Sequence, residues 1–317
     1  MAASSPTWSG YAEWADTVAA CRAEFVRVAR SFWLIPEIIP PVARDDVALL
    51  YCFCRHLDDA IDEDADTARA GAALARWRDE LRGRAPARPL IAAFVAGAAR
   101  SGLPLACAEL LLDGVASDLG VVRVADDDEL LRYAYRVSSS VGLMLAPLLG
   151  VRGAEAAWRV VDLGLGLQLS NILLGVEGDA RRGRVYLPQR RLAAAGLGAD
   201  DVLARPHDPR LRPVLLGVAA LAEPYYRSAE LGAATVPLRY RHGVMLLGRA
   251  YRALGRRAAR GRAAPATPAG LPVGFKAFHL AQLVVVGLAP RALGITSPPP
   301  HDAALHRALA GWPGVHA

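Results

Sequence analysis

Apolar residues recur with the period of an α-helix along most of this chain, and the alternating β-branched runs that are typical of strands are missing. Alanine, leucine and arginine, which all favour helices, dominate these segments. The pattern therefore predicts an all-α protein. We expect helices at residues 11–30, 44–63, 66–81, 89–100, 103–119, 127–149, 154–175, 209–234, 240–259 and 272–288.

The chain has 317 residues, which is enough for two average domains or for one large helical domain. Its Pro/Gly-rich stretch at residues 263–272 predicts a loop, and no internal repeat is present. Because linker-like sequence is scarce, we expect one helical domain over residues 1–317. The tail from about residue 297 is expected to be loosely held.

The net charge of +6 is modest, and much of it comes from residues 239–262, which hold eight arginines and no acid. A solvated helix face, an anionic membrane surface and a phosphorylated substrate are the three alternatives for this segment. Nucleic acid is not expected as a partner, because no stacking pattern of interleaved aromatic residues and no zinc pattern is present.

The four cysteines, Cys21, Cys52, Cys54 and Cys107, form neither a CxxC pair nor a spacing typical of zinc. We interpret Cys52 and Cys54 as small core residues, and expect a reduced, cytoplasmic location. The N-terminus has no signal-peptide core, and the apolar stretch at residues 280–290 is too short to span a bilayer. Any membrane contact is therefore expected to be peripheral.

The most informative segment runs from Val47 to Glu63, where a nearly unbroken apolar helix ends in carboxylates. Asp58 and Asp62 are four positions apart, so they share one helix face and repel by roughly 0.2–0.5 kcal/mol on an isolated helix. A cation between them removes that cost, and oxygen ligands suit Mg²⁺ bridging to phosphate. A solvated helix end is the alternative, but Arg55, one turn earlier, favours a site.

A second polar stripe consists of Gln168, Asn171, Gly175 and Asp179, which are 3, 4 and 4 positions apart and so line one helix face. Polar groups on an otherwise apolar helix are costly unless they face a polar site. Three arginines follow, at positions 181, 182 and 184. They predict contacts with phosphate oxygens, with an ordinary Arg-rich helix end as the alternative.

Together these segments resemble the squalene/phytoene synthase family, most closely over residues 28–190. The first signature is similar to Tyr51-x-Phe-Cys-Arg-x-x-Asp-Asp-x-x-Asp62, and the end of the second to Arg182-Gly-Arg-x-Tyr-Leu-Pro188. The resemblance also includes Ser31-Phe-Trp, Asp113-Gly…Asp118-Leu and Leu130…Gly142.

The resemblance implies an all-α isoprenoid-synthase helical bundle around a central apolar cavity. It also implies a Mg²⁺-dependent prenyltransferase, with Mn²⁺ as an alternative metal, whose partners are prenyl diphosphates. The family condenses two allylic diphosphates head to head, either geranylgeranyl diphosphate to phytoene or farnesyl diphosphate to presqualene diphosphate and squalene. The sequence at residues 179–188 looks more like phytoene synthases. No local motif decides whether NADPH is used.

The resemblance assigns a role to each candidate residue. The metal ligands would be Asp58, Asp62, Asn171 and Asp179. The residues closest to the chemistry would be Asp58, Asp62, Asp179 and Tyr186. Substrate contacts would come from Ser31, Phe32, Tyr51, Arg55, Ser138, Gly142, Gln168, Asn171 and Arg182. Small side chains at Ser138, Ser139 and Gly142 would leave room for prenyl chains in a dry cavity that protects a carbocation.

The second acidic motif departs from the family pattern. Leu174-Gly175 stands where the family has Arg-Asp, and Gly178-Asp179 where it has Glu-Asp. Glu177 is displaced by one residue, about 100° around a helix. Three alternatives follow: a weakened metal site completed by water, an enzyme altered to a single ionisation, or a non-catalytic member that binds prenyl diphosphates.

Overall fold

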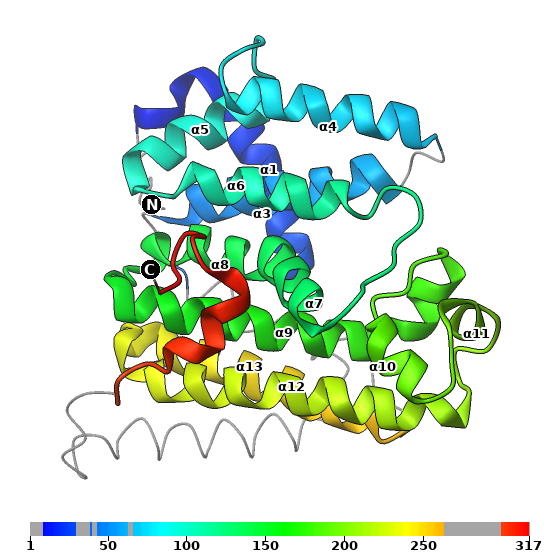
Figure 1. Ribbon diagram of the computed structural model, residues 1–317. Helices are drawn as coiled ribbons and strands as arrows, with labels where there is room; N and C mark the ends of the chain where they lie inside the picture. Colours follow the sequence, from blue (N-terminus) through cyan, green and yellow to red (C-terminus); the bar gives the residue numbers. More distant parts are fainter. Residues whose placement is uncertain (1–8, 30–38, 40–42, 63–65, 263–298, 317) are drawn as a thin grey trace. The chain divides into compact units, whose positions relative to one another are not determined.

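The computed structural model describes residues 9–29, 39, 43–62, 66–262 and 299–316. Regular structure in these residues is helical, apart from one isolated bridge between Arg123 and Val185. The chain divides into two compact units, Met1–Leu103 and Pro104–Ala317, each described by itself (Figure 1). The all-α prediction is confirmed, whereas a single domain over the whole chain stays a prediction.

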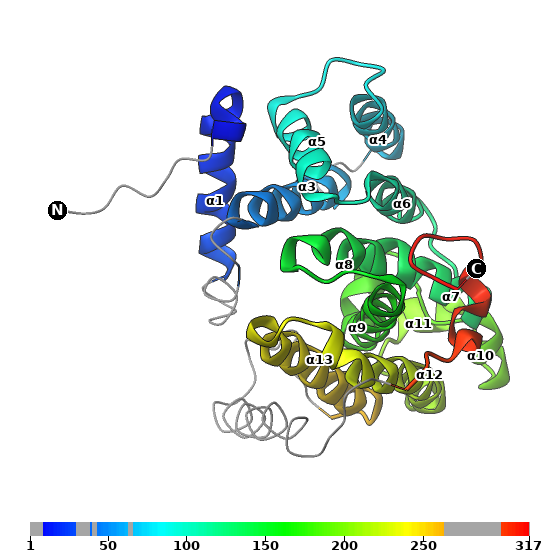
Figure 2. The same ribbon diagram turned by 90° about the vertical axis from the view of Figure 1, so that its left-hand side faces the viewer.

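Unit 1 is built around α3, against which α1, α4 and α5 all pack (Figure 2). Phe53 of α3 is fully buried, with its ring stacked on Phe94 at 4.3 Å between centroids and edge-on to Trp77 at 5.4 Å. These aromatic contacts hold the helix that carries the first acidic motif. The elements are η1 (Ser9–Trp14), α1 (Ala15–Ala29), α3 (Arg44–Asp62), α4 (Thr67–Leu81) and α5 (Pro89–Ser101).

Unit 2 is built around the long helix α9, which packs against α8, α12 and α13 (Figure 1). Its other elements surround this helix. They are α6 (Leu105–Ala116), α7 (Asp127–Ala134), the π-helical turn η4 (Tyr135–Ser139), α8 (Ser140–Leu145), η5 (Pro147–Leu149), α9 (Ala154–Arg181), α10 (Gln189–Ala194), α11 (Ala199–Ala204), η6 (Pro209–Leu211), α12 (Arg212–Leu231), η7 (Gly232–Thr235), α13 (Leu238–Ala259) and η9 (Ala303–Leu309).

Among the described helices, α9 is the one long and apolar enough to span a bilayer by length and composition. Half of its apolar window is buried inside the protein, which is the pattern of a core helix. Its apolar character is therefore explained by packing within unit 2.

Close approach of η4 to α9 depends on small residues. A Cβ at Gly164 would lie only 2.5 Å from Ser139 Cα, and the Ser139 hydroxyl donates to the Val161 carbonyl at 2.8 Å. Ser139 is fully buried in this contact. Its small size, predicted to leave room for a prenyl chain, is used here to bring two helices together.

Three of the six arginines in helix α13 form ion pairs with glutamates of α12. Arg249 and Arg252 bind Glu230 at 3.0 and 3.2 Å, and Arg252 also binds Glu223 together with Arg256. Burial raises the pKa of Glu223, but hydrogen bonds from the two arginines outweigh it and lower that pKa. These three arginines of the positively charged segment therefore join α13 to α12, and their charges are balanced by Glu223 and Glu230.

Most predicted helices are present, with different bounds. The helix predicted at 127–149 is interrupted by the π-helical turn, and the one predicted at 154–175 continues to Arg181. The short helices α10 and α11 were not predicted, because six residues are too few to show a period. The helix predicted at 272–288 lies outside the described residues.

The tail expected to be loosely held is instead packed on unit 2 over residues 299–316. His301, His306 and Leu309 are buried, and the tail crosses the unit in red in Figure 1. Asp162 of α9 accepts hydrogen bonds from His301 Nε2 at 2.7 Å and His306 Nε2 at 3.2 Å. The prediction was wrong because these partners are far from the tail in sequence.

Candidate active site

The first acidic motif lies at the C-terminal end of α3. Asp58 is exposed, while the side chain of Asp62, the last residue of the helix, is outside the described residues. Arg55 lies one turn before Asp59 and binds its carboxylate at 2.8 Å. The end of α3 therefore carries both carboxylates and a guanidinium, with Arg55 paired to Asp59.

The predicted substrate contacts at the start of the chain are only partly described. Tyr51 is half-buried on α3, with its ring 5.5 Å from that of Phe25 on α1. Burial is the main cause that raises the pKa of Tyr51, so the ring carries a neutral hydroxyl. Ser31 and Phe32 lie outside the described residues.

The second polar stripe lies on α9, as the spacing predicts. Asn171 is exposed, and its amide donates to Gln168 Oε1 at 3.4 Å. Asp179, two turns further on, has only 15% of its side chain exposed and accepts a hydrogen bond from Arg182 at 2.8 Å. The stripe therefore brings an amide, a carboxylate and a guanidinium to one end of α9.

Gly175 lies between these groups. A Cβ at this position would be 2.8 Å from Asp179 Oδ2, closer than non-bonded atoms approach. The Asp179 carboxylate thus occupies space that a side chain at 175 needs. The Asp179 side chain is therefore oriented into the space that the family's side chain at position 175 would need.

A partly buried carboxylate that the sequence reasoning did not single out lies near Asp179. Asp118 accepts hydrogen bonds from the hydroxyls of Tyr133 at 3.0 Å and Tyr186 at 2.7 Å, and the two rings stack at 4.7 Å. Burial raises the pKa of Asp118 to about 6, although the two tyrosine hydroxyls and Arg184 oppose the rise. Asp118 can therefore hold or release a proton close to neutral pH.

The loop after α9 brings Tyr186 to this carboxylate. Val185 N donates to Val122 O at 3.2 Å, and Gln189 N donates to Val124 O at 2.8 Å. The loop after α9 and the loop before α7 are thereby paired along their backbones. Asp118 and Tyr133 lie within segments of the family resemblance, but no spacing rule links positions 118, 133 and 186, which come together only in the fold.

Two small residues predicted to leave room for prenyl chains lie on η4 and on α8. Ser138 is partly exposed on the π-helical turn. Gly142 faces α9, where an added Cβ would lie 3.1 Å from Val160 Cγ1. Gly142 thus also contributes to close packing between helices.

Asn171 and Asp179 lie two turns apart on α9, and Arg182 and Tyr186 follow in the same unit, whereas Asp58 and Arg55 belong to unit 1. The oxygen donors in each group are carboxylates and amides, which are the ligands that Mg²⁺ prefers. The donor set therefore fits the predicted metal. The missing carboxylate at Gly175 leaves the group on α9 with fewer charged donors than the family pattern has.

Residues 25–274 match the family model described as Squalene/phytoene synthase. This chain belongs to the squalene/phytoene synthase family. The match extends across both units and includes both acidic segments. The predictions of the family, of an isoprenoid-synthase fold and of a head-to-head prenyltransferase are thus confirmed, while the roles of single residues stay predictions.

Two phytoene synthases are similar to this chain over most of their own length. The 15-cis-phytoene synthase of Paracoccus sp. is 37% identical over 243 residues, 74% of this chain and 79% of that protein. The 15-cis-phytoene synthase of Enterobacter agglomerans is 36% identical over 242 residues, 72% of this chain and 81% of that protein.

Solved structures of low sequence identity show the same fold. A dehydrosqualene synthase in complex with ligand has a TM-score of 0.73 and 24% identity, over 88% of this chain and 99% of that chain. The squalene synthase HpnC from Alicyclobacillus acidocaldarius has a TM-score of 0.64 and 21% identity, over 87% of this chain and 96% of that chain.

Proposed function

We propose that this chain condenses two molecules of geranylgeranyl diphosphate head to head and forms phytoene, with Mg²⁺ as the metal. The choice of substrate is supported by relatives named phytoene synthase at 33–37% identity. The observation that carries the site is the cluster of Asp179, Arg182, Asp118 and Tyr186 at the end of α9.

The end of α3 and the cluster at the end of α9 have separate tasks. Bound Mg²⁺ would supply the positive charge that turns a diphosphate into a leaving group. Asp58 in unit 1 and Asp179 in unit 2 would each provide a carboxylate ligand for metal, and the guanidinium groups of Arg55 and Arg182 would bind diphosphate oxygens in place of their present carboxylate partners. Asp118 is a positioning residue, because its two hydrogen bonds fix the rings of Tyr133 and Tyr186.

An altered or non-catalytic member that binds prenyl diphosphates is the second candidate. Gly175 favours it, because the family's carboxylate is missing from the middle of the α9 stripe. The two functions differ in turnover: a binder holds the substrate and releases no diphosphate, whereas an enzyme that performs one ionisation stops at a cyclopropylcarbinyl diphosphate.

The test is incubation of the purified chain with Mg²⁺ and either geranylgeranyl or farnesyl diphosphate, each with and without NADPH. We expect diphosphate release and phytoene from geranylgeranyl diphosphate, with no need for NADPH. Accumulation of the cyclopropyl diphosphate supports the altered reaction. Binding of both substrates without any diphosphate release contradicts the enzyme proposal.

We also propose a cytoplasmic location with peripheral membrane contact.

A further inference from the structure

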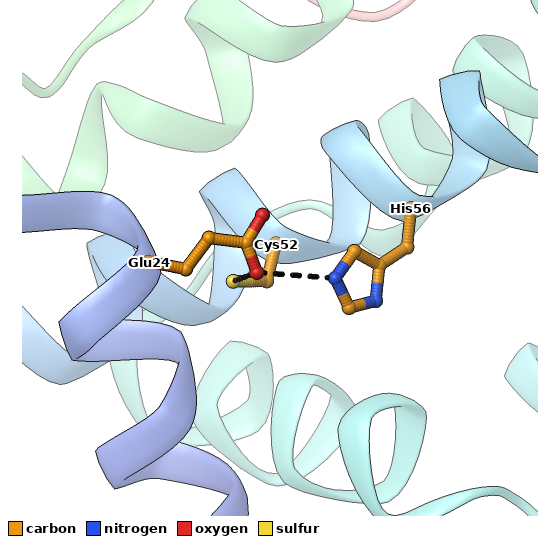
Figure 3. Close-up of side chains that lie close together, drawn as sticks. All are labelled: Glu24, Cys52 and His56. Atoms are coloured by element: carbon orange, nitrogen blue, oxygen red, sulfur yellow. Dashed lines mark hydrogen bonds and ion pairs between the residues drawn. The ribbon is translucent and has the colours of Figure 1, made fainter. Parts of the chain in front are cut away.

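A cluster of metal-ligand side chains lies between α1 and α3 in unit 1 (Figure 3). Glu24 projects from α1, and Cys52 and His56 project from α3 towards its carboxylate. Glu24 Oε2 is 3.5 Å from Cys52 Sγ and 3.2 Å from His56 Nε2. The ligand atoms of the three residues all lie within 4.8 Å of one another.

A second thiol lies beside this cluster. Cys21 is three positions before Glu24 on α1 and is buried with 4% exposure, and the Cys52 thiol donates to its backbone carbonyl at 3.8 Å. The Cys21 thiol is not one of the ligand groups that lie within 4.8 Å of one another. Three protein donors therefore meet where α1 packs on α3, and a tetrahedral ion would take water as its fourth ligand.

The distances agree with a tetrahedral metal site. Bonds of about 2.3 Å to sulfur and about 2.0–2.1 Å to nitrogen or oxygen place a sulfur and an oxygen ligand about 3.5 Å apart at the tetrahedral angle. A nitrogen and an oxygen ligand are then about 3.3 Å apart. The Cys52 Sγ–Glu24 Oε2 separation of 3.5 Å and the His56 Nε2–Glu24 Oε2 separation of 3.2 Å agree with these two expected distances.

We propose that Glu24, Cys52 and His56 bind a zinc-class cation that fastens α1 to α3. Thiolate and imidazole donors select Zn²⁺ over Mg²⁺, which takes oxygen ligands. The site is therefore chemically distinct from the carboxylate and amide donors of the candidate active site. Because α3 also carries Asp58, the cation holds the helix on which the first acidic motif is built.

The other cluster of ligand-type side chains in the described residues, formed by Asp162, His301 and His306, fits a tetrahedral ion less well, although its Asp162 Oδ1–His306 Nε2 distance of 3.2 Å equals that between Glu24 and His56. Asp162 Oδ2 is only 2.7 Å from His301 Nε2, shorter than a tetrahedral edge and typical of a hydrogen bond. The same oxygen also accepts a hydrogen bond from Ser228. The Asp162 cluster is a hydrogen-bond network between the tail and α9.

The experiment uses the full chain, purified under a thiol reductant, stripped with a chelator and titrated with Co²⁺ as a spectroscopic substitute for Zn²⁺. We expect one Co²⁺ per chain, with thiolate-to-cobalt charge-transfer absorption and the visible bands of tetrahedral coordination. Zn²⁺ should displace the Co²⁺ and raise the melting temperature, and Mg²⁺ should do neither.

Three variants locate the ion. His56→Asn changes an exposed side chain without a core cavity, and should weaken Co²⁺ binding more than about 100-fold, the upper limit for losing an outer-shell partner. Cys52→Ala should abolish the charge-transfer band. His207→Asn is the matched control, because His207 forms an exposed 3.3 Å pair with Glu177, and Co²⁺ binding should be unchanged.

Retention of tight Co²⁺ binding in His56→Asn overturns the proposal, as does absence of the thiolate band in the wild-type chain. Co²⁺ binding that is lost in His306→Asn and kept in Cys52→Ala also overturns it, because the ion would then lie at the Asp162 cluster. None of these readouts depends on prenyl transfer, so the result is separate from the proposed function.

Discussion

Single carboxylates carry most of the proposed chemistry, and their surroundings differ sharply. Asp58 is exposed at the end of α3, whereas Asp118 is partly buried and accepts hydrogen bonds from two tyrosine hydroxyls. An exposed carboxylate stays charged at little cost in free energy, and a cation can reach it. A buried one costs free energy when it ionises, so its protonation state becomes sensitive to pH.

We expect Asp58→Asn to lower turnover by about 100-fold or more, because a charged metal ligand is lost, and to leave the melting temperature nearly unchanged. The side chain is exposed, so its replacement opens no cavity. Turnover at saturating Mg²⁺ and thermal melting measure the two effects. Asp200→Asn is the control for loss of one exposed charge, since Asp200 is 99% exposed and should change neither.

Asp118 should make stability fall as the pH rises. Its folded pKa of about 6 is above the reference value of 3.8. The group therefore contributes stability that is fully present below pH 3.8 and is lost as the pH rises through 6, by about 3 kcal/mol at most. Urea unfolding of the wild type and Asp118→Asn at pH 4 and pH 7 checks this. The stability advantage of the wild type should shrink at pH 7; an equal difference at both values contradicts the assignment.

Helix α9 is the element on which packing and chemistry meet. Three of its four glycines differ in surroundings although they share one helix: an added Cβ would meet backbone at Gly164, would meet a carboxylate at Gly175, and would have nothing within 4 Å at Gly178. The intrinsic helix propensity is the same for all three, so their different effects on stability come from the residues that each one contacts.

Gly164→Ala should destabilise the protein by about 1–3 kcal/mol, because its Cβ would meet Ser139 Cα at 2.5 Å and a backbone atom cannot rotate away. Gly178→Ala is the matched substitution in open space, and should stabilise by up to about 1 kcal/mol. Chemical unfolding of both variants measures the difference. If Gly164→Ala is as stable as Gly178→Ala, the close contact of η4 with α9 is wrong.

Gly175→Asp should raise the apparent affinity for Mg²⁺ by about tenfold, because it restores a carboxylate one turn from Asn171 and Asp179. Asp179 must rotate to admit it, so Gly175→Asn serves as the control of equal size without the charge. Titrating diphosphate release with Mg²⁺, together with product analysis, compares both with the wild type. An unchanged Mg²⁺ dependence in Gly175→Asp excludes a metal on this part of α9.

At the scale of the whole molecule, distant segments of unit 2 are joined by buried polar networks. The tail at 299–316 supplies two histidines to Asp162, and Tyr225 donates to Leu305 O at 3.1 Å. Burial raises the pKa of Asp162, but hydrogen bonds from His301, His306 and Ser228 outweigh it and lower that pKa. The carboxylate depends on the tail to remain charged inside the protein.

Removing residues 299–317 should therefore lower the free energy of unfolding by about 3–5 kcal/mol, since it leaves a buried carboxylate with a hydroxyl as its remaining partner. His301→Ala removes one donor and should cost about 1–3 kcal/mol. Chemical unfolding above pH 6 measures both. A truncated chain as stable as the full one would mean that the tail is not packed on Asp162.

The sequence by itself determined the helical class, most of the helices, the two acidic segments and the family. All of these depend on residues within a turn or two of one another, such as Asp58 with Asp62 or Gln168 with Asn171, and helical periodicity makes such pairs legible. The gap at Gly175 was also visible, because it breaks a pattern of the same range.

Only the tertiary structure decided which distant residues meet. Asp118 joins Tyr186 from 68 positions away, His301 reaches Asp162 across 139, and Cys52 contacts Glu24 across 28. No local spacing encodes such pairs, because the partners are selected by how whole helices pack and by the need to satisfy every buried polar group. The same requirement made three arginines of α13 partners of α12 and packed an apparently loose tail on unit 2.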